Sequence, residues 1–334
     1  MRSVSTGFKF VAAAALSTAL SSSFSFADDH PVTETADWQK SGKAAIQERL
    51  AYKPISKKAK NVILFIGDGM GISTLTAGRI FEAQLRGESG EESYLSFERF
   101  PNTALVKTYN VDAQVADSAG TASALNTGVK TRIGVINTAP HVARNSCPTA
   151  PEDKLKPLAA FAEAAGMKTG VVSTARLTHA TPAAVYANSP NRDWENDASL
   201  GDKAGQPGCE DIASQITSTL GGDGLDVALG GGRANFLPTA GSAHGTGRRA
   251  DGRDIVGEWL ARDNAAYVQD RAGLMALKPG ADDHILGLFN NSHMSFEQDR
   301  LASDNIAEDE PTLAEMTEFA INQLSQSDTG FYLM

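Results

Sequence analysis

The chain has 334 residues, 41% of them hydrophobic, which is enough for one large α/β domain or two smaller ones. Asp and Glu (40) outnumber Lys and Arg (30), and the formal net charge of -10 argues against a nucleic-acid-binding surface. No internal repeat or low-complexity linker interrupts the sequence, so a single domain is the simplest interpretation.

The first 27 residues have the features of a signal peptide. Two basic residues accompany a largely apolar stretch at 10–20, and small residues at 25 and 27 suit a cleavage site. The apolar stretch is too short to span a bilayer. We therefore predict a periplasmic or secreted protein without a membrane anchor, whose mature domain covers residues 28–334.

Cys147 and Cys209 are the only cysteines. In an exported chain an isolated pair favours a disulfide over two free thiols. Two cysteines without nearby partners make a poor zinc site.

Apolar patterns and glycines predict helices and strands that alternate along the chain. Helices are expected at 37–52, 71–85, 156–165, 211–220 and 311–325, and strands at 61–66, 104–109, 167–173, 227–233, 284–289 and from 331 onwards. This alternation predicts an α/β fold with a largely parallel sheet and helices on both faces. Residues 128–145 show no period and are expected to form a surface excursion. The glycines at 230–232 indicate a tight turn, because the lysine and Ser/Thr of a P-loop are missing.

Asp68 stands between Gly67 and Gly69 at the end of the first predicted strand, which we expect to be buried. In open α/β sheets ligands bind beyond the carboxyl ends of the strands, and flanking glycines let the backbone approach a bound ion. Asp68 is therefore a candidate metal ligand, and a simple turn aspartate is the alternative.

Residues 116–125 read as a loop that turns into a helix, with Asp117 or Ser118 at the cap position. The first N–H groups of a helix and its dipole favour anions there, and they help a serine to become an alkoxide. Ser118 is therefore a candidate nucleophile. The alternative is a capped, alanine-rich core helix.

His179 and Thr181 follow the predicted strand 167–173 and alternate in what reads as an extended stretch, so both can face one site. The alternatives are a hydrogen-bonded surface histidine and an ordinary Thr-Pro turn. Arg192, in the segment 188–194, is either a solvated surface charge or an anion ligand.

Together these segments resemble the alkaline phosphatase family. The specific motifs are Gly-Asp-Gly-Met-Gly at 67–71 and Asp-Ser-Ala-Gly-Thr-Ala at 117–122, followed in family order by 177–184 and 188–194. The resemblance implies a role for each candidate. Ser118 would be the nucleophile and bind a zinc ion, and Asp68 would bridge metal ions. Thr181 would bind magnesium, with His179 near that metal and acting through water, while Arg192 would bind two phosphate oxygens and Asp117 would hold Arg192 in position.

The activity implied by the resemblance is hydrolysis of phosphate monoesters through a phosphoserine, with two zinc ions and one magnesium ion. Inorganic phosphate would be product and inhibitor, and the complete enzyme would be a homodimer. Animal-type members carry a disulfide in the region of the two cysteines, which supports the pairing. They also bind calcium where Asn290 here replaces a glutamate, so a calcium site is doubtful.

The family's remaining zinc ligands and its magnesium glutamate would follow Met334. We therefore expect the chain to be an N-terminal portion, inactive as given. A catalytically silent secreted phosphate-binding protein and a related phosphodiesterase or sulfatase are the alternatives.

Overall fold

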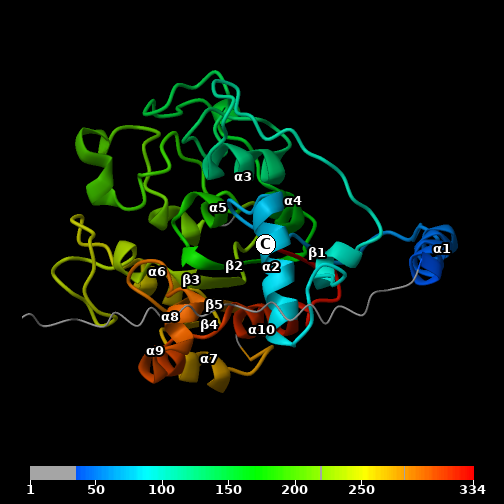
Figure 1. Cartoon of the computed structure of the whole chain (residues 1–334). Coiled ribbons are helices and arrows are strands. Elements are labelled where there is room, and N and C mark those ends of the chain that lie inside the picture. The colour runs from blue at the N-terminus through cyan, green and yellow to red at the C-terminus, as the bar shows by residue number, and fades with distance from the viewer. Residues whose placement is uncertain (1–34, 219, 282) are drawn as a thin grey trace, which may run out of the picture. The chain divides into compact units, whose positions relative to one another are not determined.

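The structure is a computed structural model that describes residues 35–218, 220–281 and 283–334. The predicted signal peptide, 1–27, lies outside the described residues. The chain divides into two compact units, Met1–Pro54 with Thr76–Thr103, and Ile55–Leu75 with Ala104–Met334 (Figure 1). Among the described residues, no helix has both the length and the apolar character needed to cross a membrane.

The smaller unit is helical. It contains α1 (Thr35–Ala51), most of α2 (Ile72–Leu85) and a 3₁₀ turn at Ser96–Arg99. An ion pair between Arg79 Nη1 and Glu98 Oε1, 2.9 Å apart, fastens that turn to α2. Both long helices match the predicted ranges 37–52 and 71–85.

The larger unit is built on one parallel sheet. In the part of the chain that the structure describes, its six strands are β1 (Val62–Ile63), β2 (Lys168–Arg176), β3 (Val227–Gly231), β4 (Ala265–Val268), β5 (His284–Leu288) and β6 (Phe331–Leu333). They lie side by side in the order β1-β6-β2-β3-β5-β4, and every neighbouring pair is parallel. The last strand in the sequence is thus inserted between the first two.

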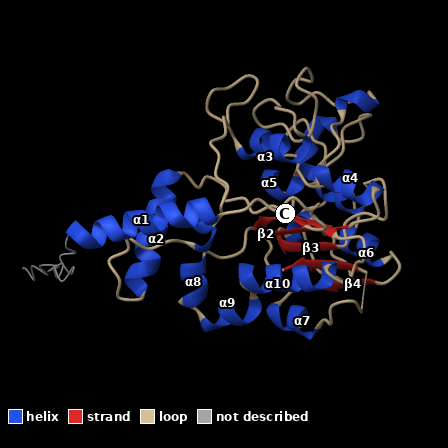
Figure 2. Cartoon of the chain, turned by 90° about the vertical axis from the view of Figure 1, so that its right-hand side faces the viewer, coloured by secondary structure: helices blue, strands red, loops and turns tan. Residues whose placement is uncertain are grey.

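Helices cover both faces of this sheet (Figure 2). The helices of the larger unit that follow the Ser118 loop are α3 (Ser118–Thr127), α4 (Leu158–Ala164), α5 (Ala180–Ala183), α6 (Ile255–Leu260), α7 (Arg271–Ala276), α8 (Glu297–Leu301), α9 (Asp304–Asp309) and α10 (Leu313–Leu324). Successive strand residues point to opposite faces. Ala228 on β3 therefore packs in the core beneath α3–α6, whereas Val227 and Leu229 pack with α7 and α10. The predicted parallel α/β sheet covered on both faces is confirmed.

Three local predictions are wrong. The strand expected at 61–66 is reduced to β1 and is exposed, with Phe65 at 72%, because β6 is the one strand of the described residues that pairs with β1. Residues 104–109 form no ladder with any described strand, and Leu105 is 95% exposed. The segment 128–145 is irregular, but its middle is buried, because Ile136 bridges to Ser189 in the interior.

Two cross-links hold the long irregular connections of the larger unit. Cys147 and Cys209 form a disulfide with their Cα atoms 4.9 Å apart, as predicted. It ties the segment after α3 to the segment before the 3₁₀ turn at Ala213–Thr217, closing a loop whose ends are 62 residues apart.

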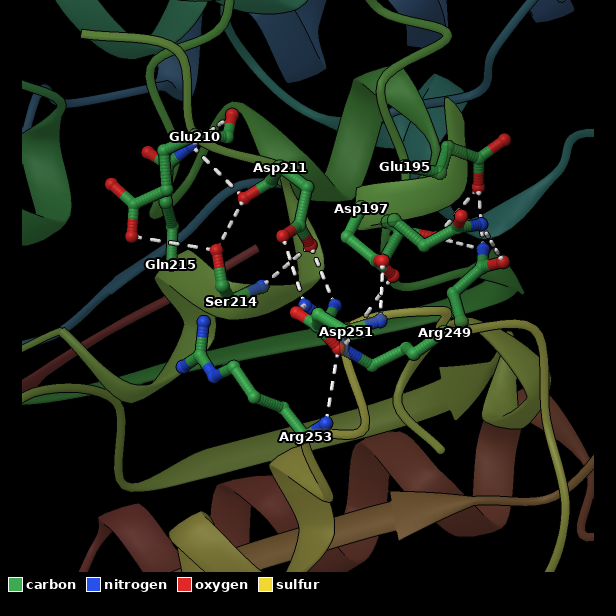
Figure 3. A network of polar contacts seen from close by, with 12 residues as sticks. Glu195, Asp197, Glu210, Asp211, Ser214, Gln215, Arg249, Asp251 and Arg253 are labelled. Carbon is green, nitrogen blue, oxygen red and sulfur yellow. Dashed lines mark hydrogen bonds and ion pairs between the residues drawn. The ribbon is translucent and has the colours of Figure 1, made fainter. Parts of the chain in front are cut away.

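The second cross-link is centred on Arg249, whose side chain is fully buried (Figure 3). Its guanidinium donates to both carboxylate oxygens of Asp211, at 2.8 and 3.1 Å, and to Asp251. Asp197 accepts hydrogen bonds from the backbone N–H groups of residues 250 and 251. The network therefore joins the connection 196–217 to the connection 238–254.

Candidate active site

Ser118 is the first residue of α3, and Asp117 is its N-cap. The Asp117 carboxylate accepts a hydrogen bond from the backbone N–H of Gly120 at 3.1 Å, so the capping pattern that the sequence indicates is present. Gly120 is buried, and a Cβ there would strike the amide of Asn110, which itself donates to Asp117. A residue without a side chain is therefore needed at 120 to keep this cap in place.

Four donors surround the Asp117 carboxylate. Besides Gly120 N–H and Asn110 Nδ2, these are Gly134 N–H at 3.0 Å and Arg192 Nη1 at 3.0 Å. Burial alone would raise the pKa of Asp117, but hydrogen bonds from all four donors outweigh it and leave the pKa below its ordinary value. Asp117 is thus a fixed negative charge that orients Arg192.

The second contact of Arg192 is with His179. Arg192 Nη2 lies 3.1 Å from His179 Nε2, and a guanidinium can only donate, so this ring nitrogen is unprotonated. Burial first, and then the charges of Arg192 and Arg176, lower the pKa of His179, which agrees with a neutral ring. The Arg192 guanidinium is half-buried and held on two sides.

The Asp68 carboxylate accepts hydrogen bonds from two hydroxyl groups. Ser118 Oγ donates to Asp68 Oδ1 at 2.9 Å, and Thr181 Oγ1 donates to Asp68 Oδ2 at 2.7 Å. His179 and Thr181 are brought together by a different geometry from the predicted extended stretch, because Thr181 lies inside the short helix α5 and His179 precedes it. All six predicted site residues therefore gather beyond the carboxyl ends of β1 and β2.

The donor atoms around Asp68 are all oxygens. Oxygen ligands completed by water suit magnesium, so Asp68 and Thr181 fit part of a magnesium site. Zinc sites in proteins draw three or four ligands from His, Cys, Asp and Glu. Within residues 35–218, 220–281 and 283–334, no three such side chains come together as a metal-binding group. The described residues thus do not form a zinc site by themselves.

Two neighbours of the site were absent from the sequence-based prediction. Arg176, the last residue of β2, donates two hydrogen bonds to the carboxylate of Glu195, from Nε at 2.7 Å and from Nη2 at 2.6 Å. Glu195 lies three residues after Arg192 in the sequence. His293 packs edge-to-face on His179 with ring centroids 5.0 Å apart, and its Nδ1 accepts from the Arg176 N–H. Neither residue lies in a recognisable motif, and only the fold brings them to His179.

Comparison with known proteins gives one family. The model of the alkaline phosphatase family matches residues 59–334. The chain is 38% identical over 308 residues to the alkaline phosphatase of Gadus morhua, covering 89% of this chain and 63% of that protein. It is 40% identical over 309 residues to the tissue-nonspecific alkaline phosphatase of Gallus gallus, covering 89% and 58%. The chain thus spans about six tenths of the length of these relatives.

Solved structures agree with the sequence relatives. The alkaline phosphatase of Thermus thermophilus superimposes with a TM-score of 0.63 at 26% identity, covering 83% of this chain and 49% of that one. The cold-active alkaline phosphatase of a Shewanella species gives 0.60 at 27% identity, covering 82% and 55%. With a family match over most of its length and the same fold, the chain belongs to the alkaline phosphatase family.

Proposed function

We propose that this chain carries the nucleophile and the phosphate-binding arginine of an enzyme that hydrolyses phosphate monoesters. The observation that carries the proposal is the cluster at the start of α3, where Ser118 donates to Asp68 while Asp117 directs Arg192. Because the chain spans about six tenths of its relatives, the proposal concerns the enzyme that contains it.

The reaction proceeds in two displacements at phosphorus. Ser118 Oγ attacks, the bond to the ester oxygen breaks, and the alcohol leaves with a proton while phosphoserine forms. Water then attacks the phosphoserine, which releases inorganic phosphate and restores the Ser118 hydroxyl. The first N–H groups of α3 and its dipole favour the anionic serine oxygen and the phosphate near it.

Arg192 binds two phosphate oxygens and so fixes the orientation of the ester for in-line attack. Its own orientation comes from Asp117 at 3.0 Å and from His179 at 3.1 Å. A guanidinium held on two sides loses little freedom on binding, and it is already placed for the charge of the transition state.

We further propose the metal complement of the family resemblance, two zinc ions and one magnesium ion. Asp68 and Thr181 would hold the magnesium ion, with His179 acting through water, and the ion would offset negative charge near the phosphate. For the zinc ions the described residues offer Asp68 and the Ser118 oxygen.

The test of the nucleophile is covalent trapping. The enzyme is incubated with radioactive inorganic phosphate at acidic pH, denatured and mapped by mass spectrometry. Phosphate should appear on Ser118 and should be absent from Ser118→Ala. Ser123→Ala, which changes a buried serine of the same helix, should still be labelled. Labelling of any residue other than Ser118 in the unsubstituted enzyme would overturn the assignment.

Export to the periplasm or the cell exterior and assembly as a homodimer complete the proposal. The signal-like residues 1–27 and the Cys147–Cys209 disulfide support export. Fractionation of producing cells tests the first, and light scattering of the purified enzyme tests the second.

A further inference from the structure

Two short segments of the larger unit are joined to each other at both ends. One runs from Arg176, the last residue of β2, to His179, and the other runs from Arg192 to Glu195. At one end Arg192 Nη2 lies 3.1 Å from His179 Nε2. At the other end Glu195 accepts two hydrogen bonds from Arg176, at 2.7 and 2.6 Å. The contact that orients Arg192 therefore belongs to a pair of segments whose opposite end is held by Glu195.

Among the described residues, four hydrogen bonds hold the Glu195 carboxylate. Besides the two from Arg176, Thr178 Oγ1 donates at 2.6 Å and Asn235 Nδ2 at 3.1 Å. The side chain of Glu195 is 16% exposed. Burial alone would raise the pKa of Glu195, but the hydrogen bonds from Arg176 and Thr178 outweigh it and leave the pKa below its ordinary value. A carboxylate held in this way is a rigid, charged anchor.

Arg176 also supports the histidine that contacts Arg192. The backbone N–H of Arg176 donates to His293 Nδ1 at 3.2 Å, and the His293 ring packs edge-to-face on His179 with ring centroids 5.0 Å apart. The end of β2 is thus connected to Arg192 by two routes, one through the His179 ring and one through Glu195 and the chain between 192 and 195.

We propose that Glu195 is a positioning residue for Arg192. It holds the segment 192–195 on the end of β2, so that the guanidinium keeps its place beside His179. The inference rests on the proposed function, because that function assigns the phosphate to Arg192. It makes a negative charge necessary for tight binding of an anion. Electrostatic attraction alone predicts the reverse, since removing a carboxylate near an anion site strengthens the attraction.

The experiment measures the dissociation constant of inorganic phosphate by isothermal titration calorimetry, with the purified enzyme that contains this chain. Glu195→Gln keeps the size of the side chain and removes its charge, so Arg176 loses its ionic partner. It should weaken phosphate binding about three- to tenfold, because an arginine that can move loses part of its paired hydrogen bonds.

Asp193→Asn is the matched control. It also removes one negative charge from the segment 192–195, and it breaks the exposed ion pair of Asp193 with Arg144. Because exposed ion pairs contribute little, it should change the dissociation constant by less than about twofold. A loss for Asp193→Asn as large as that for Glu195→Gln would overturn the inference.

A double variant separates positioning from a general effect on the fold. Arg192→Ala removes the residue that Glu195 positions, so adding Glu195→Gln should weaken phosphate binding no further. A loss from Glu195→Gln that persists in full on the Arg192→Ala background would overturn the inference. Unchanged or tighter binding by Glu195→Gln alone would also overturn it.

Thermal unfolding checks that each variant is folded at the temperature of the titration. If Glu195→Gln does not fold, Arg176→Lys carries the test, because it keeps the charge and loses the two-bond geometry. It should weaken phosphate binding about two- to threefold, and an unchanged dissociation constant would overturn the inference. If Arg192→Ala binds phosphate as tightly as the wild type, the proposed phosphate site itself fails, whatever Glu195→Gln does.

Discussion

Arg192 is the residue whose role can be tested most directly, because a second arginine lies nearby in a different setting. Arg192 is half-buried between Asp117 and His179, whereas Arg144 is more exposed and pairs with Asp193, the next residue in the chain. Both carry one positive charge in the same neighbourhood. A comparison of the two separates a positioned ligand from general electrostatic attraction.

Arg192→Ala should weaken inhibition by inorganic phosphate about 10- to 100-fold, because two charge-assisted hydrogen bonds are lost. Arg144→Ala should change it less than twofold, since exposed charges are screened by salt. Inhibition constants measured at fixed ionic strength decide the matter. Equal effects of the two substitutions would show that Arg192 acts only through its charge.

The six site residues could be predicted because each stands in a short motif next to a strand end or a helix start. The residues that hold them could not. Asn110 and Gly134 lie 7 and 17 residues from Asp117, and His293 reaches His179 from a distant part of the sequence; nothing in the surroundings of these three residues marks them as partners of the site. Their contribution comes from the fold, which places long connections against one another.

At the scale of whole elements, the Arg249 network holds the connection 196–217 against the connection 238–254. The side chain is fully buried and binds Asp211 through two hydrogen bonds. Removing one partner of a buried ion pair leaves the other charge uncompensated in the interior.

Arg249→Met should lower the free energy of unfolding by about 3–5 kcal/mol. Arg253→Ala, which breaks an exposed pair with Glu258, should lower it by less than about 1 kcal/mol. Urea titration followed by fluorescence measures both. A loss for Arg249→Met as small as that for Arg253→Ala would contradict the prediction.

Glu163 on α4 links the start of β2 to the loop before β3. It accepts hydrogen bonds from Thr169 Oγ1 and from the Gly224 N–H, and it interacts electrostatically with Asp223 and Asp226. Burial raises the pKa of Glu163 from 4.5 to about 7, with the charges of Asp223 and Asp226 adding to the shift. A folded-state pKa above the unfolded one favours folding at low pH, and this contribution is lost as pH rises from 4.5 through 7.

Glu163→Gln stays neutral at every pH, so it should reduce the loss of unfolding free energy between pH 5 and 8 by an amount on the order of 1 kcal/mol. Part of the slope should persist, because burial also raises the pKa of Asp226 to about 6. Glu315→Gln is the control: a hydrogen bond from Arg271 lowers the pKa of Glu315 to about 2, so it is charged throughout this range. Glu315→Gln should lower or raise the free energy of unfolding equally at every pH in this range and leave its slope against pH unchanged. An unchanged slope for Glu163→Gln would refute the prediction.

Long periodic elements were predictable, and short ones were not. α10 has apolar residues at helical spacing, and β3 and β5 lie in largely apolar runs. These hydrophobic patterns are long enough to identify a helix and two buried strands from the sequence. β4 has four residues, and α6 to α9 have five or six each, which is too few to show a period. Residues 104–109 have a strand-like composition but find no partner strand in the described chain.

At the scale of the whole molecule, the 334-residue chain as given should hydrolyse no phosphate monoester above background. Among the described residues, Asp68 is the only carboxylate hydrogen-bonded to Ser118, and no three metal-binding side chains gather. Without zinc ligands Ser118 stays a neutral, weak nucleophile.

The measurement is turnover of p-nitrophenyl phosphate at alkaline pH with zinc and magnesium added. Ser118→Ala serves as the background. Metal-dependent turnover that Ser118→Ala abolishes would disprove this prediction, and would mean that the described residues complete a working site.

The place of β6 has a consequence for synthesis. The Asn61 side chain before β1 accepts a hydrogen bond from Phe331, 270 residues later, and β2 also pairs with β6. At about 5–20 residues per second, a ribosome needs roughly 13–54 s to pass from β1 to β6. Until β6 is made, β1 has no ladder partner among the described strands, and β2, once made, exposes the unpaired backbone groups of the edge that pairs with β6. The nascent chain is therefore most open to aggregation, and in most need of a chaperone, before residues 331–333 emerge.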